Sequence, residues 1–411
     1  MGDTAFASSD FPSALEEGTA AEDPTPKAVR EHAHPHGAVQ APEEHEAHEP
    51  HETHHHAHAT GSKPALRGDP HIHFILTTGA AWLSGVHPFP QGGHALDENG
   101  FALQGLEFGG SMAVNPYFGV RLSIELAHLH LEEAYLTLAP IPGTQDGRIG
   151  YFNSRFGHHN AMHFHSWRFI NPVLSHSRFM DEEAFSAPGM AWTVTLPLAW
   201  ESRIAFELLS TSGQGAFRSA TFGTVEMTES GRLDGLEDFV YVGRWENDVS
   251  FAAHGEFNWN ASGAWGQSPF VPDNRAALWG ADLGVQWLPG GIHGSSGFRL
   301  TSEGILRQTQ IPEDAPQDWG ADVSLEVLVA PLWSVAIRGD VADVLGKTPE
   351  HAELLGGQHQ RGSLAMTFRP THDARVRLQG DVMASEAVEE TILGVFLQIE
   401  VMAGSHPSHN H

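Results

Sequence analysis

The sequence predicts an all-β fold, a transmembrane antiparallel β-barrel of about 16 strands preceded by a disordered N-terminal arm. Three observations carry this prediction. Apolar and polar residues alternate along segments of about ten residues, short turn-like connections alternate with long ones, and tryptophans gather near predicted strand ends. We divide the chain into an arm of residues 1–69, a barrel of residues 70–404 and a short histidine-containing tail of residues 405–411.

The strand periodicity is clearest near the end of the chain. Between residues 391 and 401, Leu393, Val395, Leu397, Ile399 and Val401 share one face, and glycine, glutamine and glutamate occupy the other with Phe396. A run of about ten residues is long enough to cross a bilayer at a tilt. About sixteen such runs occur, and an even number of strands is typical of bacterial outer-membrane barrels. They begin near Ile72, Ala102, Val120, Leu131, Arg148, Met190, Ile204, Val240, Glu256, Ala277, Phe298, Ala321, Ser334, Gly362, Ala374 and Ile392.

The connections between these runs alternate in length. Turn-like pieces such as Asn115-Pro116-Tyr117 and Pro370-Thr371-His372-Asp373 stand between long connections at 85–100, 156–188, 210–238 and 266–275. Short periplasmic turns opposite longer outer loops are typical of outer-membrane barrels, whereas a soluble β-sandwich has no reason to keep this alternation. Tryptophans near strand ends fit an interfacial girdle, although they would also pack a soluble β core. They are Trp82, Trp192, Trp200, Trp245, Trp265, Trp279, Trp287, Trp319 and Trp333.

Composition limits the partners and the compartment. The formal net charge is -29, from 22 basic and 51 acidic residues, and cysteine is absent. Such a chain lacks the basic clusters that bind nucleic acid, so we expect outer-membrane lipid and divalent cations as partners. No apolar stretch is long enough for a membrane-spanning helix. The chain opens without a basic-then-apolar export segment, so for an outer-membrane protein we expect the numbering to begin at or near the mature end.

The arm of residues 1–69 is rich in Ala, Glu, Pro and His, and its low hydrophobicity predicts disorder. Imidazoles beside carboxylates bind Zn²⁺, Ni²⁺ or Cu²⁺, and a flexible arm would hold several ions weakly. The alternative is a solvated low-complexity linker. The metal-ligand candidates in the arm are His32, His34, His36, His54, His55, His56 and His58.

A second group of candidate ligands lies in the long connection between residues 157 and 188: His158, His159, His163, His165 and His176. Trp167 and Phe169 predict that this connection is partly buried, because large aromatics seldom decorate a free loop. Folded into the lumen, it would narrow the pore and place imidazoles beside the permeation path. The alternative is a structural plug in which Asn160, His163 and His165 satisfy hydrogen bonds.

Charged residues on the polar faces of the strands form a third set. Inside a barrel they would pair across strands and set ion selectivity, or simply neutralise one another around a wet interior. The set is Arg121, Glu125, Glu132, Arg148, Arg203, Glu207, Asp282, Arg299, Glu303, Asp322, Glu326, Arg338, Asp340, Arg375, Arg377, Asp381 and Glu400. No nucleophile elbow, Walker loop or zincin spacing is present, so we expect neither an enzyme nor a required cofactor.

The middle of the chain resembles a family of Gram-negative outer-membrane proteins labelled zinc-regulated TonB-dependent receptors or putative porins. The resemblance rests on Leu131-Glu132-Glu133-Ala134-Tyr135-Leu136, Arg155-Phe156-Gly157, Asn160, His163, His165-Ser166-Trp167, Phe169, Arg178-Phe179 and Pro188-Gly189. It implies a barrel linked to zinc supply, with His163 and His165 as the positions carried over. Arg168 and Asn171 stand where the family pattern has aspartates. A TonB-driven receptor needs a folded plug and about 22 strands. The arm is too short and polar for a plug and no energy-coupling box is visible, so we do not expect TonB coupling.

These observations lead to one main hypothesis and two alternatives. The main hypothesis is an outer-membrane channel for divalent metal ions, zinc first, with a histidine-rich constriction loop. The alternatives are a general diffusion porin with incidental histidines, and a soluble β-protein that sequesters metal. Which solute passes, whether the pore is open and whether barrels form homo-oligomers stay open at this point.

Overall fold

The computed structural model describes residues 70–87, 92–138, 146–180, 184–210, 235–267, 275–290, 296–311, 314–346 and 357–404. All of them belong to the unit Ala57–His411, and the arm and tail lie outside them. The strands are β1(His71–Leu83), β2(Gly100–Ala113), β3(Phe118–Glu125), β4(His130–Leu138), β5(Asp146–Asn153), β6(Ser186–Thr195), β7(Glu201–Leu209), β8(Val240–Phe251), β9(Gly255–Gln267), β10(Arg275–Trp287), β11(Gly297–Thr309), β12(Gln317–Ala330), β13(Trp333–Leu345), β14(His359–Thr371), β15(Ala374–Ser385) and β16(Val388–Gly404). The short helices are η1(Phe164–Ser166), α1(Leu174–Phe179) and η2(Leu236–Asp238). No helix in the described ranges is long and apolar enough to cross a membrane.

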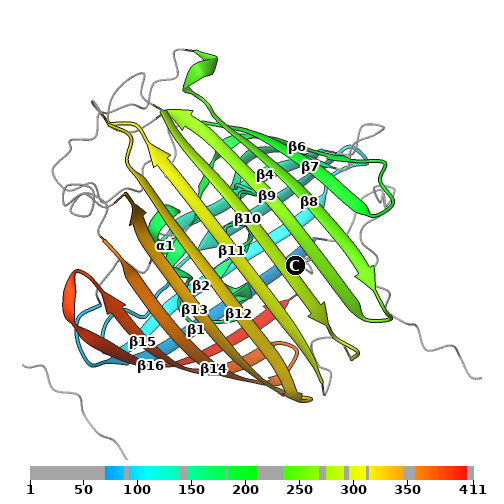
Figure 1. Cartoon of the computed structure of the whole chain (residues 1–411). Helices are drawn as coiled ribbons and strands as arrows, with labels where there is room; N and C mark the ends of the chain where they lie inside the picture. Colours follow the sequence, from blue (N-terminus) through cyan, green and yellow to red (C-terminus); the bar gives the residue numbers. More distant parts are fainter. Residues whose placement is uncertain are drawn as a thin grey trace, which may run out of the picture. The chain divides into compact units, whose positions relative to one another are not determined.

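The strands form one closed antiparallel barrel, in which each strand pairs with its neighbours in sequence and β1 pairs with β16 (Figure 1). The closing seam is continuous from His73 opposite Gly404 to Leu83 opposite Gly394. Closure leaves no unpaired strand edge, which is the condition for a sheet to lie in lipid. The predicted fold class, with sixteen strands, is therefore confirmed.

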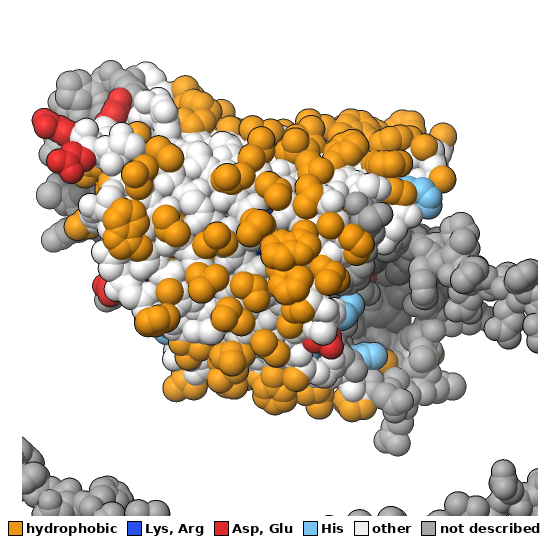
Figure 2. All heavy atoms as spheres, turned by 90° about the horizontal axis from the view of Figure 1, so that it is seen from below, with side chains coloured by type: hydrophobic (Ala, Val, Ile, Leu, Met, Phe, Trp, Pro, Cys, Tyr) orange, Lys and Arg blue, Asp and Glu red, His pale blue; other side chains and the backbone are white. Residues whose placement is uncertain are grey.

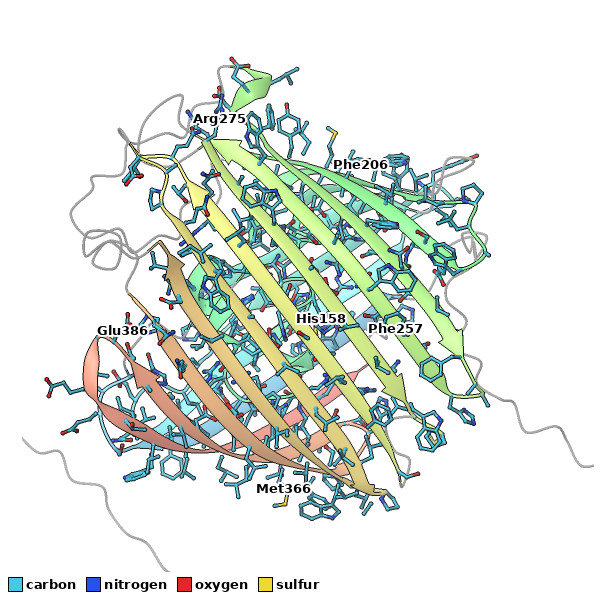
Figure 3. All side chains as sticks on the ribbon, in the orientation of Figure 1. His158, Phe206, Phe257, Arg275, Met366 and Glu386 are labelled. Atoms are coloured by element: carbon cyan, nitrogen blue, oxygen red, sulfur yellow. The ribbon has the colours of Figure 1, made fainter. Side chains whose placement is uncertain are left out.

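The two faces of the wall differ as the strand periodicity predicts. Along β16, Leu393, Val395, Leu397, Ile399 and Val401 are all exposed, while the residues between them up to Gln398 are buried. Hydrophobic side chains spread over the face seen in Figure 2, where charged side chains are few. Phe206 and Met366 point outward in Figure 3, and His158 lies inside the barrel. A soluble β-protein would bury its apolar faces in a dry interior, so this arrangement excludes that alternative.

The ends of the barrel also follow the prediction. The first and last strands begin and end at the same rim as the short connections, which on outer-membrane barrels is the periplasmic side. The opposite rim carries the longer connections 84–99, 154–185, 210–239, 268–274, 310–316 and 346–358, together with two short ones at 126–129 and 386–387. Seven of the nine tryptophans that the sequence assigns to strand ends are exposed on the outer face, as an interfacial girdle requires. They are Trp82, Trp200, Trp245, Trp265, Trp279, Trp287 and Trp333.

Candidate functional site

The connection between β5 and β6, residues 154–185, folds into the barrel and is called here the inner segment; residues 181–183 of it lie outside the described ranges. Its two ends are joined. The Ser154 amide donates to the carbonyl oxygen of Phe185 at 2.8 Å. The Asn160 side chain donates to the carbonyls of Ser154 and Phe185 at 2.8 and 3.1 Å, and accepts from the Phe185 amide at 2.6 Å. Asn160 therefore has the structural role that the sequence analysis offered as an alternative.

Glycines let the inner segment enter and lie against the wall. Gly157 has φ +73°, and a Cβ there would lie 2.1 Å from a carboxylate oxygen of Glu303, so only glycine fits without strain. On the wall, Gly105 of β2 accommodates the ring of Phe164, because a Cβ would lie 2.4 Å from it. Gly320 of β12 leaves room for Phe179 and Ser175 of α1. Small residues on the inner face thus set how closely the segment packs.

The inner segment is hydrogen-bonded to most of the barrel wall. Side chains of β9, β11, β13, β14 and β15 bond to its backbone: Ser262 to Gly157, Glu303 to His158 and His159, Arg338 to Asn171, Arg361 to Pro172, Asp340 to Leu174, Gln379 to Ile170 and Arg375 to His165. Lumen-facing residues that would be wet in an open pore are buried beneath it; Glu303 is 2%, and Arg377 and Gln379 are each 1% exposed. The segment therefore occupies much of the lumen at its level, and the prediction that it folds inward is confirmed.

Charges on the inner face pair across strands, as expected. Arg244 of β8 lies 2.8 Å from Asp282 of β10, Arg361 of β14 lies 2.7 Å from Asp340 of β13, and Arg375 of β15 lies 2.7 Å from Glu400 of β16. Buried ion pairs add little net stability, but removing one partner leaves a costly uncompensated charge. Each of these three arginines therefore has its charge balanced by a carboxylate on another strand.

A cluster of histidines and glutamates joins η1 to strands β2, β3 and β4. His163 lies 3.4 Å from Glu132 and 3.2 Å from Glu133, and His165 lies 2.8 Å from Glu107. The two imidazoles are stacked with ring centroids 5.6 Å apart. Single ligand atoms of Glu107, Glu132 and His163 lie within 4.8 Å of one another, a spacing that could hold a metal ion. In the structure these groups bond to each other, so the hydrogen-bonding role proposed for His163 and His165 is fulfilled.

Protonation of His163 strengthens this contact. Burial alone would lower the pKa of His163, but hydrogen bonds to the Glu132 and Glu133 carboxylates outweigh it and hold the pKa well above its ordinary value. Arg121, 3.1 Å from Glu133, and Glu107 and His165 on the other side complete the charged surroundings. With both ring nitrogens protonated, His163 can donate to both carboxylates at once.

We therefore expect stability to fall as the pH rises through the raised folded pKa of His163. A raised folded pKa gives a contribution that is complete below the unfolded value of about 6.5 and is lost above the folded one. Each charge-assisted hydrogen bond is worth about 1.5–3 kcal/mol. Denaturant unfolding of the detergent-solubilised protein between pH 6 and pH 10 measures this, and His163→Gln should flatten the decline. An equal decline in the variant would remove His163 from the explanation.

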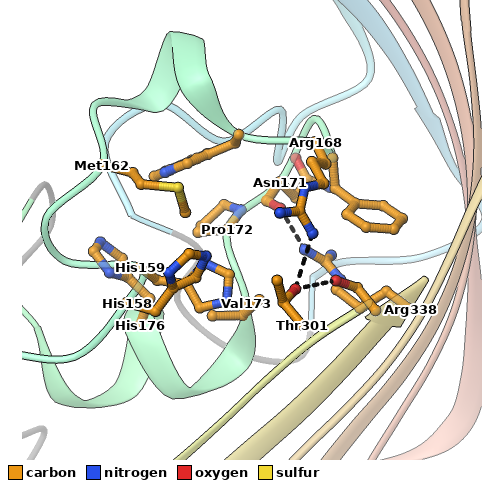
Figure 4. A pocket seen from close by; sticks show the side chains of 13 residues that line it. His158, His159, Met162, Arg168, Asn171, Pro172, Val173, His176, Thr301 and Arg338 are labelled. Carbon is orange, nitrogen blue, oxygen red and sulfur yellow. Dashed lines mark hydrogen bonds between the residues drawn. The ribbon is translucent and has the colours of Figure 1, made fainter. Parts of the chain in front are cut away.

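Two cavities flank the inner segment. One, of about 400 Å³, lies between the segment and strands β11, β12 and β13 (Figure 4). His158, His159 and His176 lie on one side of it, and Arg168, Thr301 and Arg338 on the other. The second, of about 350 Å³, is lined by His94, His130, Glu132 and His163 among others. Met162 and Trp167 line both cavities.

The structure distributes the predicted metal ligands over separate places. His163 and His165 meet the glutamates of β2 and β4, His159 meets Glu303 and Asp322, and His176 is buried edge-on against Trp167. His158 lies beside His159, with ring centroids 5.2 Å apart. The five histidines therefore do not converge on one centre. The arm candidates His32, His34, His36, His54, His55, His56 and His58 lie outside the described residues.

Sequence reasoning missed two further lumen histidines. His73 of β1 lies 3.2 Å from Glu107. Its place between exposed Ile72 and Phe74 is a period-two signal that would have identified it. His94 stacks on Phe164 with ring centroids 4.0 Å apart, but it lies in an irregular connection that gives no such signal.

At the level of sequence, comparison with known proteins gives a partial match. The sequence matches no known family model. An uncharacterized protein of Aquifex aeolicus (strain VF5) is 27% identical over 136 residues, 33% of this chain and 29% of that protein, so the chain spans under a third of its length.

Solved structures are similar over most of the barrel. The outer membrane channel DcaP of Acinetobacter baumannii has TM-score 0.56 and 11% identity, covering 82% of this chain and 98% of that one. An anion-selective porin of Comamonas acidovorans has TM-score 0.54 and 10% identity, covering 82% and 99%. OprB of Pseudomonas putida has TM-score 0.53 and 12% identity, covering 82% and 94%. These similarities support the porin part of the family resemblance and not its zinc-regulated, TonB-dependent part. The chain has the fold of porin-type barrels, and its apolar outer face places it in a bacterial outer membrane.

Proposed function

We propose that this barrel is a diffusion channel for small hydrophilic solutes and that the inner segment forms its narrowest part. The observation that carries the proposal is the position of the segment, which is hydrogen-bonded around the lumen and flanked by two cavities lined by both polar and apolar side chains. A pore lined by hydrogen-bonding groups inside an apolar wall favours hydrated solutes. The general porin alternative thus accounts for more of the geometry than dedicated metal uptake does.

Met162 and Trp167 line both cavities and so lie between them, and we place the narrowest point of the proposed path there. Trp167 is buried and touches Phe164 and His176 edge-on, so its indole is held in place. Solute passing from one cavity to the other must pass this pair. Both cavities are small, so we expect only small solutes to pass.

Liposome swelling with neutral sugars of increasing size tests the proposal. Trp167→Ala should speed entry several-fold and raise the size limit, because it removes the largest side chain at the narrow point. Trp333→Ala is a matched control, since Trp333 stacks on Phe368 on the outer face. Heat-modifiable migration on gels confirms folding of each variant. Absence of sugar entry in the wild type and in Trp167→Ala alike would contradict the proposal.

Divalent metal uptake is a second candidate, favoured by one observation. Glu132 and His163 line the second cavity together with His94 and His130, so carboxylates and imidazoles would stand beside the path. The histidine-rich arm would gather cations near the barrel. Zinc flux measured in the same vesicles discriminates between the two functions: His163→Ala with His165→Ala should lower zinc flux and spare sugar entry if the channel serves metal.

A further inference from the structure

Three ligand-bearing side chains meet where the inner segment touches β11 and β12. His159 Nε2 lies 3.3 Å from Asp322 Oδ2 and 4.0 Å from Glu303 Oε2, and one ligand atom of each residue lies within 4.8 Å of the other two. Glu303 and Asp322 are paired in register on neighbouring strands and both face inward. Their side chains are 2% and 0% exposed.

This place brings two buried carboxylates together beside one imidazole. Glu303 accepts hydrogen bonds from the backbone amides of His158 and His159 at 2.7 and 3.2 Å, which carry no net charge. The nearby Arg244 pairs with Asp282, and Arg338 pairs with Asp340 and donates to the Asn171 carbonyl, so within the described residues neither forms an ion pair with Glu303 or Asp322. Burying two carboxylates beside a single imidazole is costly unless a cation or a proton compensates.

One ligand atom is also unused. Asp322 Oδ1 is buried and accepts no hydrogen bond from any described residue. Buried carboxylate oxygens are normally bonded, so this oxygen is available to accept a bond from a ligand that enters the cluster. A divalent cation supplies both the charge and the bond that this oxygen lacks.

The other candidate cluster differs in this respect. Around Glu107, Glu132 and His163, the Ser123 hydroxyl lies 2.9 Å from Glu107 and 2.5 Å from Glu132, and His73 and His165 bond to the Glu107 carboxylate. A metal ion there would have to displace these bonds. Each cluster combines one histidine with two carboxylates, but among the described residues only the cluster on β11 and β12 has a buried carboxylate oxygen without a hydrogen-bond partner.

We infer that His159, Glu303 and Asp322 bind a divalent transition-metal cation that fastens the inner segment to the barrel wall. One imidazole with two carboxylates is an N/O donor set that suits Zn²⁺, with water in the remaining position. Tetrahedral zinc with bonds of about 2.0–2.2 Å separates its ligand atoms by about 3.4 Å, and His159 Nε2 lies 3.3 Å from Asp322 Oδ2 and 4.0 Å from Glu303 Oε2. His159 and His158 line the larger cavity, which gives a cation access. The inference does not depend on what the barrel conducts.

The experiment uses the full-length protein in detergent, stripped with a chelator and then titrated with Zn²⁺ by equilibrium dialysis and metal analysis. The variants are His159→Ala and Asp322→Asn, and His158→Ala is the matched control, since it removes the neighbouring imidazole and keeps the backbone amide. Ions held by the histidine-rich arm are common to all four proteins. The wild type and His158→Ala should each bind one additional equivalent of Zn²⁺ tightly, compared with His159→Ala and Asp322→Asn.

Thermal unfolding gives a second readout that ion binding to the arm would not produce. Zn²⁺ should raise the unfolding temperature of the wild type and of His158→Ala, because the cation binds only when the inner segment lies against the barrel wall. The unfolding temperatures of His159→Ala and Asp322→Asn should not change. If Asp322→Asn fails to fold, His159→Ala, which changes no strand residue, decides the matter. Equal zinc stoichiometry and equal temperature shifts in the wild type and His159→Ala would overturn the inference.

Discussion

Replacing residues 157–183 by a short glycine-rich turn should raise single-channel conductance several-fold. A barrel of 16 strands leaves an aqueous channel when nothing fills it, and in this chain the inner segment bonds to strands on most of the wall. Ser154 and Phe185 are already paired at 2.8 Å, so a short turn can close β5 onto β6 without altering their register. The measurement is conductance in planar bilayers.

The expected cost of this replacement is a less stable barrel. Wall groups such as Glu303, Arg338 and Gln379 lose their partners in the segment and become hydrated instead. Hydration offsets most of this loss, because water replaces each bond. Trp333→Ala, which changes the outer face and leaves the segment intact, serves as the control and should conduct as the wild type does. Unchanged conductance in a correctly folded replacement variant would mean that the segment does not limit passage.

The barrel could be predicted from the sequence because its period-two signal is local. Each strand shows its lipid face directly, as β16 does with Leu393, Val395 and Leu397, and no distant partner is needed to read it. The aromatic run around His163 likewise indicated burial. The inner segment starts at residue 154 and β6 at Ser186, so even these bounds were within a few residues of the prediction.

The site itself could not be predicted, because its contacts depend on where the inner segment meets the wall. His159 meets Asp322, 163 residues away, and His163 meets Glu133, 30 residues away. The alternation of apolar and polar residues along each strand identifies these two acidic residues as inward-facing. It does not give the height of each residue along the barrel axis or the path of the inner segment. The family resemblance does not predict these contacts either. Arg168 stands where the family has aspartate, and in this chain it faces Glu326 at 3.9 Å, where a carboxylate would be repelled.

An arginine in the middle of the outer face should destabilise the barrel strongly. Leu364 lies near the centre of β14 and is 57% exposed, with Ile337 and Gly380 opposite it on the neighbouring strands. If that face contacts lipid, Leu364→Arg must bring a charge into the hydrocarbon layer, at a cost of about 2–4 kcal/mol at the midplane.

The matched control is Leu345→Arg, at the last residue of β13 and 41% exposed, where the cost near the interface is about 0–1 kcal/mol. Unfolding by denaturant in lipid vesicles compares the two variants with the wild type. The dependence on depth is the informative quantity. A soluble protein with exposed leucines would tolerate both arginines equally, since water solvates a charge at any height, so equal costs at the two positions would contradict the membrane-spanning assignment.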